Sequence, residues 1–275
     1  MSTSVTSILR RMSGGRFRLL TFNTLFRPAA RARLRAIAPI INGSGIEIVC
    51  LQEVIYRANA SLLKRELTLY EPPAAHRFGI WCVGGLVTFS RVPIRKTSYG
   101  VFERRGQWRS LGAADRLLRK GFLTTAHEIE GVSVVVINTH LLANYDQDWS
   151  ARNRFARDQE AELTQLSDAI ATTSHESLVI VAGDLNVPAG SDMFQRFVRT
   201  SGLVNAFGAR NSPDTLRPLP SGGPGFVIDH ILYRPPSGVT VECDAQTMLE
   251  ATVDLGSGRT AFPSDHLGVC ATFII

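Results

Sequence analysis

Six places in the chain combine a short apolar segment with polar side chains that can bind a metal ion or a phosphate group. They read Phe22-Asn23, Leu51-Gln52-Glu53, Asn138-Thr139-His140, Gly183-Asp184-Leu185-Asn186, Ile228-Asp229-His230 and Ser264-Asp265-His266. Carboxylate and carboxamide oxygens are hard ligands, which suit Mg²⁺ or Mn²⁺ better than zinc or copper. A single such residue often only caps a turn, and for Asn23 alone that is the better explanation. The six together indicate a metal and phosphate site.

Glu53 is the residue best suited to hold the metal. Magnesium keeps several of its waters and is normally bound by one or two carboxylates together with substrate phosphate. Because Glu53 is a carboxylate directly after an apolar run, we predict it as the main protein ligand.

The elements that must position these residues are strands and helices in an irregular order. Short apolar runs rich in β-branched residues predict strands at 17–22, 46–51, 85–90, 122–129, 132–138, 178–182, 226–233 and 267–274. Helical patterns occur at 28–41, 59–69, 149–171 and 191–200. The stretch 213–225 reads as a loop, and so does much of 99–120. Since the order is neither strict βαβ alternation nor all-β, and since Glu130-Gly131 joins two strands as a hairpin, we expect mixed sheets packed face to face with helices outside.

Length and composition indicate one domain with a sizeable core. The chain has 275 residues, 44% of them hydrophobic, and large α/β sandwiches reach this length with a single core. We assign residues 16–275 to that domain and residues 1–15, a Ser/Thr/Arg stretch, to a flexible N-terminal segment. The four cysteines, Cys50, Cys82, Cys243 and Cys270, have no CxxC spacing and are expected to be free thiols, mostly buried.

The charge balance leaves the partner open. The formal net charge is +6, and Lys64, Lys96 and Lys120 are the only lysines, so arginine supplies the excess. A polyanionic partner or an anionic membrane surface would suit this balance, and so would an even spread that binds nothing. No apolar run approaches the roughly 20 residues that cross a bilayer, and no secretory signal is evident, so a cytoplasmic protein is expected. No protein partner or oligomeric state can be inferred.

In order and spacing, the six motifs resemble the endonuclease/exonuclease/phosphatase superfamily of DNase I-like enzymes. Gly-Asp-Leu-Asn at 183–186 together with Ser-Asp-His at 264–266 is a specific combination, and the likeness runs from about residue 16 to 274. The resemblance implies a four-layer α/β sandwich whose two mixed, mostly antiparallel sheets carry the site at one end. It also implies a phosphoesterase that depends on Mg²⁺, for which Mn²⁺ can substitute.

The resemblance also suggests roles for the individual residues. Glu53, with Asn23 nearby and Asp265 through a water, would hold the metal against a phosphate oxygen. His266 would pair with Asp229, which fixes the imidazole tautomer. Asp184 and Asn186 would orient the attacking water, and His140 would donate a hydrogen bond to the phosphoryl group. Whether Asp184 or His266 is the base, and whether one metal or two are used, stays open.

His140 leads through Leu-Leu-Ala-Asn-Tyr into a helix that bears Arg and Gln, which is similar to the neutral sphingomyelinase-like branch. Lys120-Gly121 before the preceding strand also resembles that branch, whereas Asn144 stands where an acidic residue is more typical. The first hypothesis is therefore a phosphodiesterase acting on a phospholipid such as sphingomyelin, or on a small organic phosphodiester.

Two alternatives remain. A DNase I-like nuclease acting on DNA or RNA would use the arginine surface along a phosphate backbone. A non-catalytic binding protein is disfavoured because the complete set of polar residues is present. The aromatic and basic residues between Tyr99 and Lys120 could clamp a lipid headgroup or stack on bases, or form an ordinary loop. The remaining histidines, His76, His127, His175 and His230, are interpreted as packing or surface residues.

Overall fold

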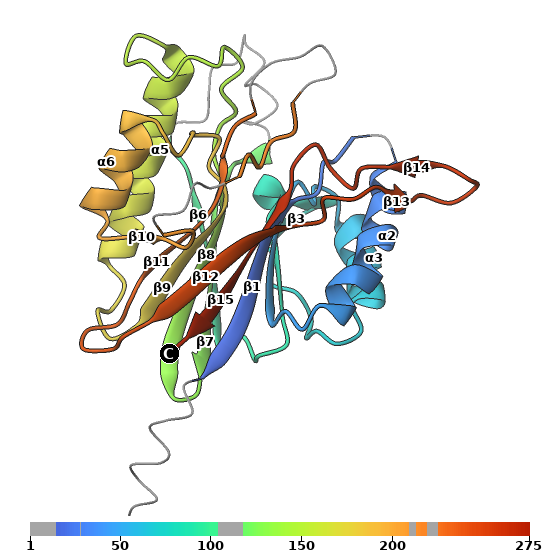
Figure 1. The fold of residues 1–275 in the computed structure, drawn as a ribbon, viewed down its shortest axis with the longest axis horizontal. Helices are drawn as coiled ribbons and strands as arrows, with labels where there is room; N and C mark the ends of the chain where they lie inside the picture. Colours follow the sequence, from blue (N-terminus) through green and yellow to red (C-terminus); the bar gives the residue numbers. More distant parts are fainter. Residues whose placement is uncertain (1–14, 28, 104–117, 209–212, 219–224) are drawn as a thin grey trace, which may run out of the picture.

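The computed structural model describes residues 15–27, 29–103, 118–208, 213–218 and 225–275, which form two β-sheets between two pairs of helices (Figure 1). The first sheet has the order β12-β15-β1-β2-β5 and the second β10-β11-β9-β8-β7-β6. The strands of the first sheet are β12 Glu242–Met248, β15 Gly268–Ile274, β1 Arg16–Asn23, β2 Ile48–Gln52 and β5 Val87–Ser90. Those of the second are β10 Val204–Asn205, β11 Asp229–Arg234, β9 Leu178–Asp184, β8 Val132–His140, β7 Gly121–Ile129 and β6 Lys96–Val101.

Alternating side chains of the central strands pack into two different hydrophobic cores. In β1, Leu19 packs between the two sheets, whereas Leu20 packs against the helices α2 (Ala30–Gly43) and α3 (Arg57–Glu66). On the far side of the second sheet, Val179 and Val181 of β9 pack against another pair, α5 (Arg154–Ala171) and α6 (Asp192–Thr200). Both faces of each sheet are therefore covered, which explains why these strands read as continuous apolar runs. The predicted four-layer α/β sandwich is confirmed.

The helices form where apolar residues recur at helical spacing. In α2 the buried side chains are Leu34, Ile37, Ala38 and Ile41, which face the first sheet. The helix α5 begins at Arg154 and not near residue 149, because the side chain of Asn153 caps it by accepting hydrogen bonds from the amides of Phe155 and Ala156. The short 3₁₀ helix η1 (Val83–Gly85) lies beside the end of β2.

Two parallel strand pairs bring polar strand ends to one edge of the sandwich. The strand β1 runs parallel to β2, and β8 runs parallel to β9, whereas the other named neighbours are antiparallel. Parallel strands end at the same edge. In register, Asn23 lies opposite Gln52, and His140 lies opposite Asp184. Asp229 opens β11 opposite Asp184, so it reaches the same edge from the other direction.

The start of the segment 99–120, much of which was predicted as a loop, belongs to a strand. Residues Tyr99–Val101 complete β6, where pairing with β7 satisfies their backbone groups. Phe102 is fully buried against Phe122, so it cannot take part in a clamp for headgroups or bases. Residues 104–117, including the predicted contacts Trp108, Arg104, Arg105, Arg109 and Arg116, lie outside the described residues.

Several short or exposed strands were not predicted from the sequence. The strand β12 is a half-exposed edge strand with little apolar periodicity. Two small ribbons pair β3 (Arg77–Phe78) with β4 (Trp81–Cys82), and β13 (Val253–Asp254) with β14 (Thr260–Ala261), the latter projecting beyond α2 in Figure 1. In such strands, neighbouring elements decide the structure more than local pattern does.

All four cysteines are free; Cys50, Cys82 and Cys270 are buried and Cys243 is half-buried. Apart from Gly15, the predicted flexible segment 1–15 lies outside the described residues, so the proposed division at residue 16 stays a prediction. Among the helices of the described part of the chain, none is both long and apolar enough to cross a bilayer.

Candidate active site

Asp184 lies at the centre of the polar strand ends. Its buried Oδ2 accepts a hydrogen bond from Asn23 Nδ2 at 3.0 Å and lies 3.4 Å from His140 Nε2 and 3.8 Å from His266 Nε2. Its Oδ1 accepts from the amide of Asn186 at 2.9 Å. Burial raises the pKa of Asp184 to about 7, although the nearby His266 charge opposes the shift. Asn23, His140 and His266, from three other strand ends, are thus gathered around one carboxylate.

His266 and Asp229 form a buried hydrogen-bonded pair. His266 Nδ1 lies 2.8 Å from Asp229 Oδ2, so Nε2 is left facing Asp184. Burial alone would lower the pKa of His266, but the charges of Asp229 and Asp184 outweigh burial and raise the pKa to about 10. The pair predicted from the sequence therefore has the geometry that fixes a histidine tautomer.

Thr215, which the sequence reasoning did not single out, holds this pair in place. Its buried Oγ1 accepts hydrogen bonds from the amides of Ile228 and Asp229, both at 3.0 Å. Its carbonyl accepts from the amide of Leu267, next to His266, at 2.7 Å. No motif marks this threonine, because its partners are 13 and 14 residues away in a different segment.

Glu53 is held in an unusual backbone conformation at the end of β2. Its φ of 61° lies in the left-handed region, and its half-buried carboxylate accepts from Asn23 Nδ2 at 3.2 Å and from the amide of Phe26 at 2.9 Å. Gly85 of η1 lies so close that a Cβ there would sit 3.1 Å from Glu53 Cα. A strained residue that its surroundings hold firmly is typical of functional positions.

Lys120 is a second residue that the sequence reasoning did not place among the site residues. Its buried Nζ lies 3.0 Å from His140 Nε2 and donates to the carbonyl of Leu141 at 2.7 Å. Burial, the Lys120 charge and the His266 charge all lower the pKa of His140. A neutral His140 therefore accepts from Lys120. The signal in the sequence was the Lys120-Gly121 pair before β7, which had served only to compare branches of the superfamily.

The predicted residues line one cavity of about 230 Å³, which we call the catalytic cavity. Seven of the eight predicted site residues border it: Asn23, Glu53, His140, Asp184, Asn186, Asp265 and His266. The eighth, Asp229, lies behind His266 and is fully buried. Lys120 and Tyr145 also border the cavity. The structure thus brings together the whole predicted set.

The donor set fits a hard divalent cation. Glu53 and the half-exposed Asp265 offer carboxylate oxygens at the cavity. Asn23 instead points its amide nitrogen at Glu53 and Asp184, while its Oδ1 accepts from the amide of Leu25. Ligand atoms of Asp184, Asp229 and His266 also lie within 4.8 Å of one another, but the last two already bond to each other. Glu53 and Asp265 are therefore the better candidates for metal ligands.

Two polar side chains, Gln159 of α5 and Trp149 just before α5, hydrogen bond to the loops that carry the site. Gln159 donates from Nε2 to the carbonyls of Leu142 and Asn186, both at 2.8 Å. Trp149 Nε1 donates to the same carbonyl of Asn186 at 3.1 Å. The loops after β8 and β9, which carry the site, are thereby tied to one helix.

A second set of buried hydrogen bonds joins the two sheets beneath the site. Gln52 Nε2 of the first sheet donates to Asn138 Oδ1 of the second at 2.8 Å. Asn138 Nδ2 in turn donates to the carbonyls of Leu51 and Val87. These contacts explain why motif residues next to Glu53 and His140 are polar although they do not reach the cavity.

The remaining histidines do not reach the catalytic cavity. His230 stacks on Phe194 with ring centroids 4.3 Å apart and faces the carbonyl of Val187, which confirms its packing role. His127 is buried between the sheets and the loop after β5, whereas His76 and His175 are exposed.

Comparison with known proteins identifies the family of the chain. Residues 20–266 match the Endonuclease/Exonuclease/phosphatase family. A Drosophila melanogaster protein named "Putative neutral sphingomyelinase" is 27% identical over 254 residues, covering 88% of this chain and 56% of the relative. Sphingomyelinase C from Listeria ivanovii is 29% identical over 111 residues, covering 40% of this chain and 31% of the relative. The chain thus spans at most about half the length of these curated relatives.

Solved structures share the fold at low sequence identity. Sphingomyelinase C from Streptomyces griseocarneus superposes with a TM-score of 0.72 at 21% identity, covering 94% of this chain and 99% of that one. D. rerio TDP2, solved with a single-strand DNA product, superposes with a TM-score of 0.72 at 17% identity, again covering 94% of this chain and 99% of that one. These likenesses establish a DNase I-like fold.

Fold and cavity together place this chain in the class of proteins with a DNase I-like fold and a polar cavity at one end of the two sheets. The chain belongs to the Endonuclease/Exonuclease/phosphatase family, whose model matches most of its length. Enzymes of this family generally use a divalent metal, in keeping with the oxygen ligands of the catalytic cavity.

Proposed function

We propose that this protein is a Mg²⁺-dependent phosphodiesterase acting on a phospholipid or a small organic phosphodiester. The single observation that carries the proposal is the catalytic cavity itself, in which acidic residues and the His266–Asp229 pair surround Asp184. Glu53 and Asp265 would hold the cation, with Asn23 orienting the carboxylates. When bound, the cation neutralises charge on a phosphate oxygen.

The chain's own residues supply the remaining parts of the reaction. Asp184 and His266 face each other at 3.8 Å and act as one proton-sharing unit that orients the attacking water. Asp229 keeps His266 in the orientation that leaves Nε2 at the cavity. Lys120 and His140, which also lie beside Asp184, stabilise negative charge that develops on the phosphoryl group.

The test uses bis-p-nitrophenyl phosphate with Mg²⁺ and two pairs of variants. Glu53→Gln and His266→Asn should each lower kcat/KM by at least about a hundredfold, the typical value of a transition-state contact. Exposed matched controls, Glu160→Gln and His175→Asn, should stay within about twofold of the wild type. Chelation should abolish activity and added Mg²⁺ restore it. Full activity in either site variant would contradict the proposal.

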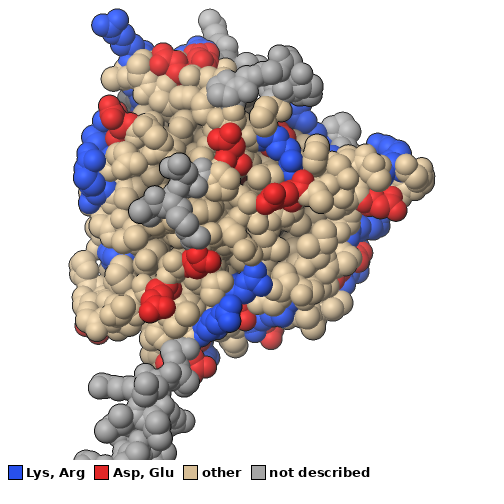
Figure 2. Space-filling model, viewed as in Figure 1, with Lys and Arg blue, Asp and Glu red and all other residues tan. Residues whose placement is uncertain are grey.

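Natural substrates decide between the two hydrolase hypotheses. The same protein is offered sphingomyelin vesicles, plasmid DNA and a single-stranded oligonucleotide. The matched relatives named as sphingomyelinases favour the lipid. Acidic and basic side chains are interspersed on the face in Figure 2, without the basic stripe that tracks a nucleic acid backbone among the residues coloured there. Plasmid nicking without lipid turnover would support the nuclease alternative. The expected cytoplasmic location stays a prediction, which cell fractionation would check.

A further inference from the structure

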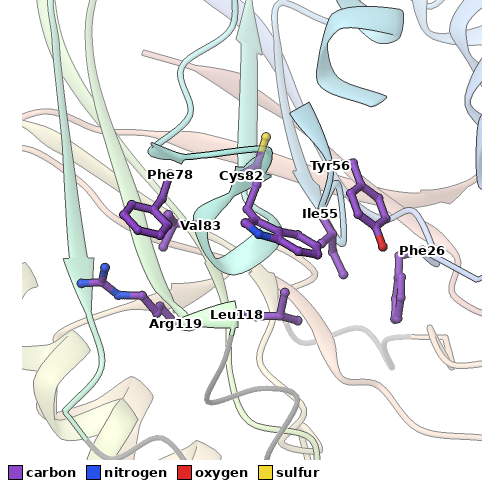
Figure 3. A pocket seen from close by; sticks show the side chains of 9 residues that line it. Phe26, Ile55, Tyr56, Phe78, Cys82, Val83, Leu118 and Arg119 are labelled. Atoms are coloured by element: carbon purple, nitrogen blue, oxygen red, sulfur yellow. The ribbon is translucent and has the colours of Figure 1, made fainter. Parts of the chain in front are cut away.

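A second cavity of about 380 Å³, which we call the apolar cavity, lies beside the catalytic cavity (Figure 3). Its walls come from four separate parts of the chain and are mostly aromatic or aliphatic. They include Phe26, Ile55, Tyr56, Phe78, Trp81 and Leu118. Figure 3 shows Phe78 and Arg119 at one side of the cavity and Tyr56 and Phe26 at the other.

The two cavities share part of their walls. Phe26, Ile55 and Leu118 border both of them. The amide of Phe26 donates to the Glu53 carboxylate at 2.9 Å, and Ile55 follows Glu53 by two residues. A substrate whose phosphate lies at Glu53 would therefore place one of its ester groups against these shared walls.

Backbone hydrogen bonds and ring packing hold the walls of the apolar cavity in place. The carbonyl of Ile55 accepts from the amide of Cys82 at 2.7 Å, and the carbonyl of Ile80 accepts from the amide of Arg57 at 2.9 Å. Tyr56 and Trp81 pack ring against ring, with centroids 5.0 Å apart. The ribbon of β3 and β4 is thus fastened to the segment that follows Glu53.

The chemistry of the walls selects a hydrocarbon group. Four aromatic side chains stay 39% to 67% exposed, namely Trp81, Tyr56, Phe26 and Phe78. Clustered exposed apolar surface of this kind marks a binding site. Among the lining side chains, only Arg119, the Tyr56 hydroxyl, the Trp81 indole N–H and the Cys82 thiol offer polar atoms, fewer than the array that reads the edge of a nucleobase. A hydrocarbon chain needs no such partners and gains from leaving water.

We propose that the apolar cavity binds the hydrocarbon part of an amphiphilic phosphodiester whose phosphate is cleaved in the catalytic cavity. The inference rests on the proposed function for the cleavage and deepens it by naming the substrate class. Trp81 and Phe78 are the specificity-determining residues, because both lie on the ribbon and neither borders the catalytic cavity.

The test is a series of p-nitrophenyl phosphodiesters whose second ester carries a methyl, butyl or octyl chain, used below micelle formation. We expect kcat/KM of the wild type to rise at least tenfold from methyl to octyl. Trp81→Ala and Phe78→Ala should lose most of that rise. Leu69→Ala, which removes an apolar side chain that is 56% exposed and does not border either cavity, should keep it.

The outcomes separate the two proposals. Hydrolysis of all three esters at equal rates would overturn the hydrocarbon site and leave the phosphodiesterase intact. Faster hydrolysis of a nucleoside p-nitrophenyl phosphate than of the octyl ester would assign the cavity to a nucleobase instead. If no ester is hydrolysed, calorimetry with octyl phosphate and methyl phosphate still decides. Binding of octyl phosphate should be at least tenfold tighter and lose that preference in Trp81→Ala, whereas equal affinities would refute the site.

Discussion

At the scale of single residues, Thr215 shows how a side chain outside the cavity controls the residues inside it. One hydroxyl oxygen accepts from two buried amides, those of Ile228 and Asp229, at the start of β11. The Thr215 carbonyl meanwhile anchors Leu267, next to His266. The position of the His266–Asp229 pair therefore depends on a residue that touches neither imidazole nor carboxylate.

Thr215→Val should destabilise the protein and impair catalysis together. Valine keeps the shape but leaves two buried amides without an acceptor, at a cost of about 2 to 4 kcal/mol in the free energy of unfolding. We also expect kcat to fall about tenfold while KM stays near the wild-type value, because the pair shifts. Thr215→Ser keeps the oxygen and should cost only about 1 kcal/mol, the value of a buried methyl group. Urea unfolding and steady-state kinetics measure both; equal losses in the two variants would refute the hydrogen-bond account.

Asn23 and Lys120 mark the limit of residue-level prediction. The sequence places Asn23 near the site without indicating which of its atoms faces the carboxylates, and it does not place Lys120 there at all. Asn23 presents its amide nitrogen to two carboxylates, one of them 161 residues away, and Lys120 reaches His140 across neighbouring strands. Side-chain orientation follows from these distant partners, which no local pattern encodes.

At the scale of elements, the close approach of η1 to the end of β2 positions Glu53. Gly85 has a φ of 67° and makes room for the Glu53 backbone, while its carbonyl accepts from the amide of Val54 at 2.9 Å. Any side chain at residue 85 would push the two segments apart.

Gly85→Ala should therefore lower activity by more than the loss of stability from its left-handed backbone conformation accounts for. Gly79, at the tip of the β3–β4 ribbon, is the matched control because its φ is also positive, at 56°, but a Cβ there meets nothing within 4 Å. Each alanine should cost about 1 kcal/mol of stability through the left-handed backbone conformation. We expect only Gly85→Ala to weaken Mg²⁺ binding and to lower kcat, by about tenfold or more. Calorimetric Mg²⁺ titration and kinetics provide the readouts, and identical behaviour of the two variants would disprove the positioning role.

At the scale of the whole molecule, two buried histidines make stability depend on pH. Burial lowers the pKa of His127 and of His230 to about 4, despite backbone hydrogen bonds that oppose the shift. In the unfolded chain, both return to about 6.5. Between these values the unfolded state binds more protons, so the folded state loses stability as the pH falls.

We expect the free energy of unfolding to be maximal with respect to these two groups above about pH 6.5 and to decline progressively toward pH 4. The decline is roughly 3 kcal/mol for each histidine, since each pKa unit corresponds to about 1.4 kcal/mol. His127→Gln, which lies away from the catalytic cavity, should remove its share of the dependence between pH 6.5 and 4. Urea unfolding at several pH values tests this, and an unchanged slope in the variant would contradict the assignment.

The central strands, the paired helices and the polar residues that meet at the cavity could be predicted from the sequence, because apolar periodicity and strand-end motifs are local properties of the chain. Edge strands such as β12 and the β3–β4 ribbon could not, since their pairing depends on neighbours and not on their own pattern. Tertiary structure alone decided the contacts around Asp184, the support from Thr215 and the apolar cavity beside Glu53. Each of these arises where segments far apart in the chain meet, and only the packing of the two sheets fixes which atoms come into contact.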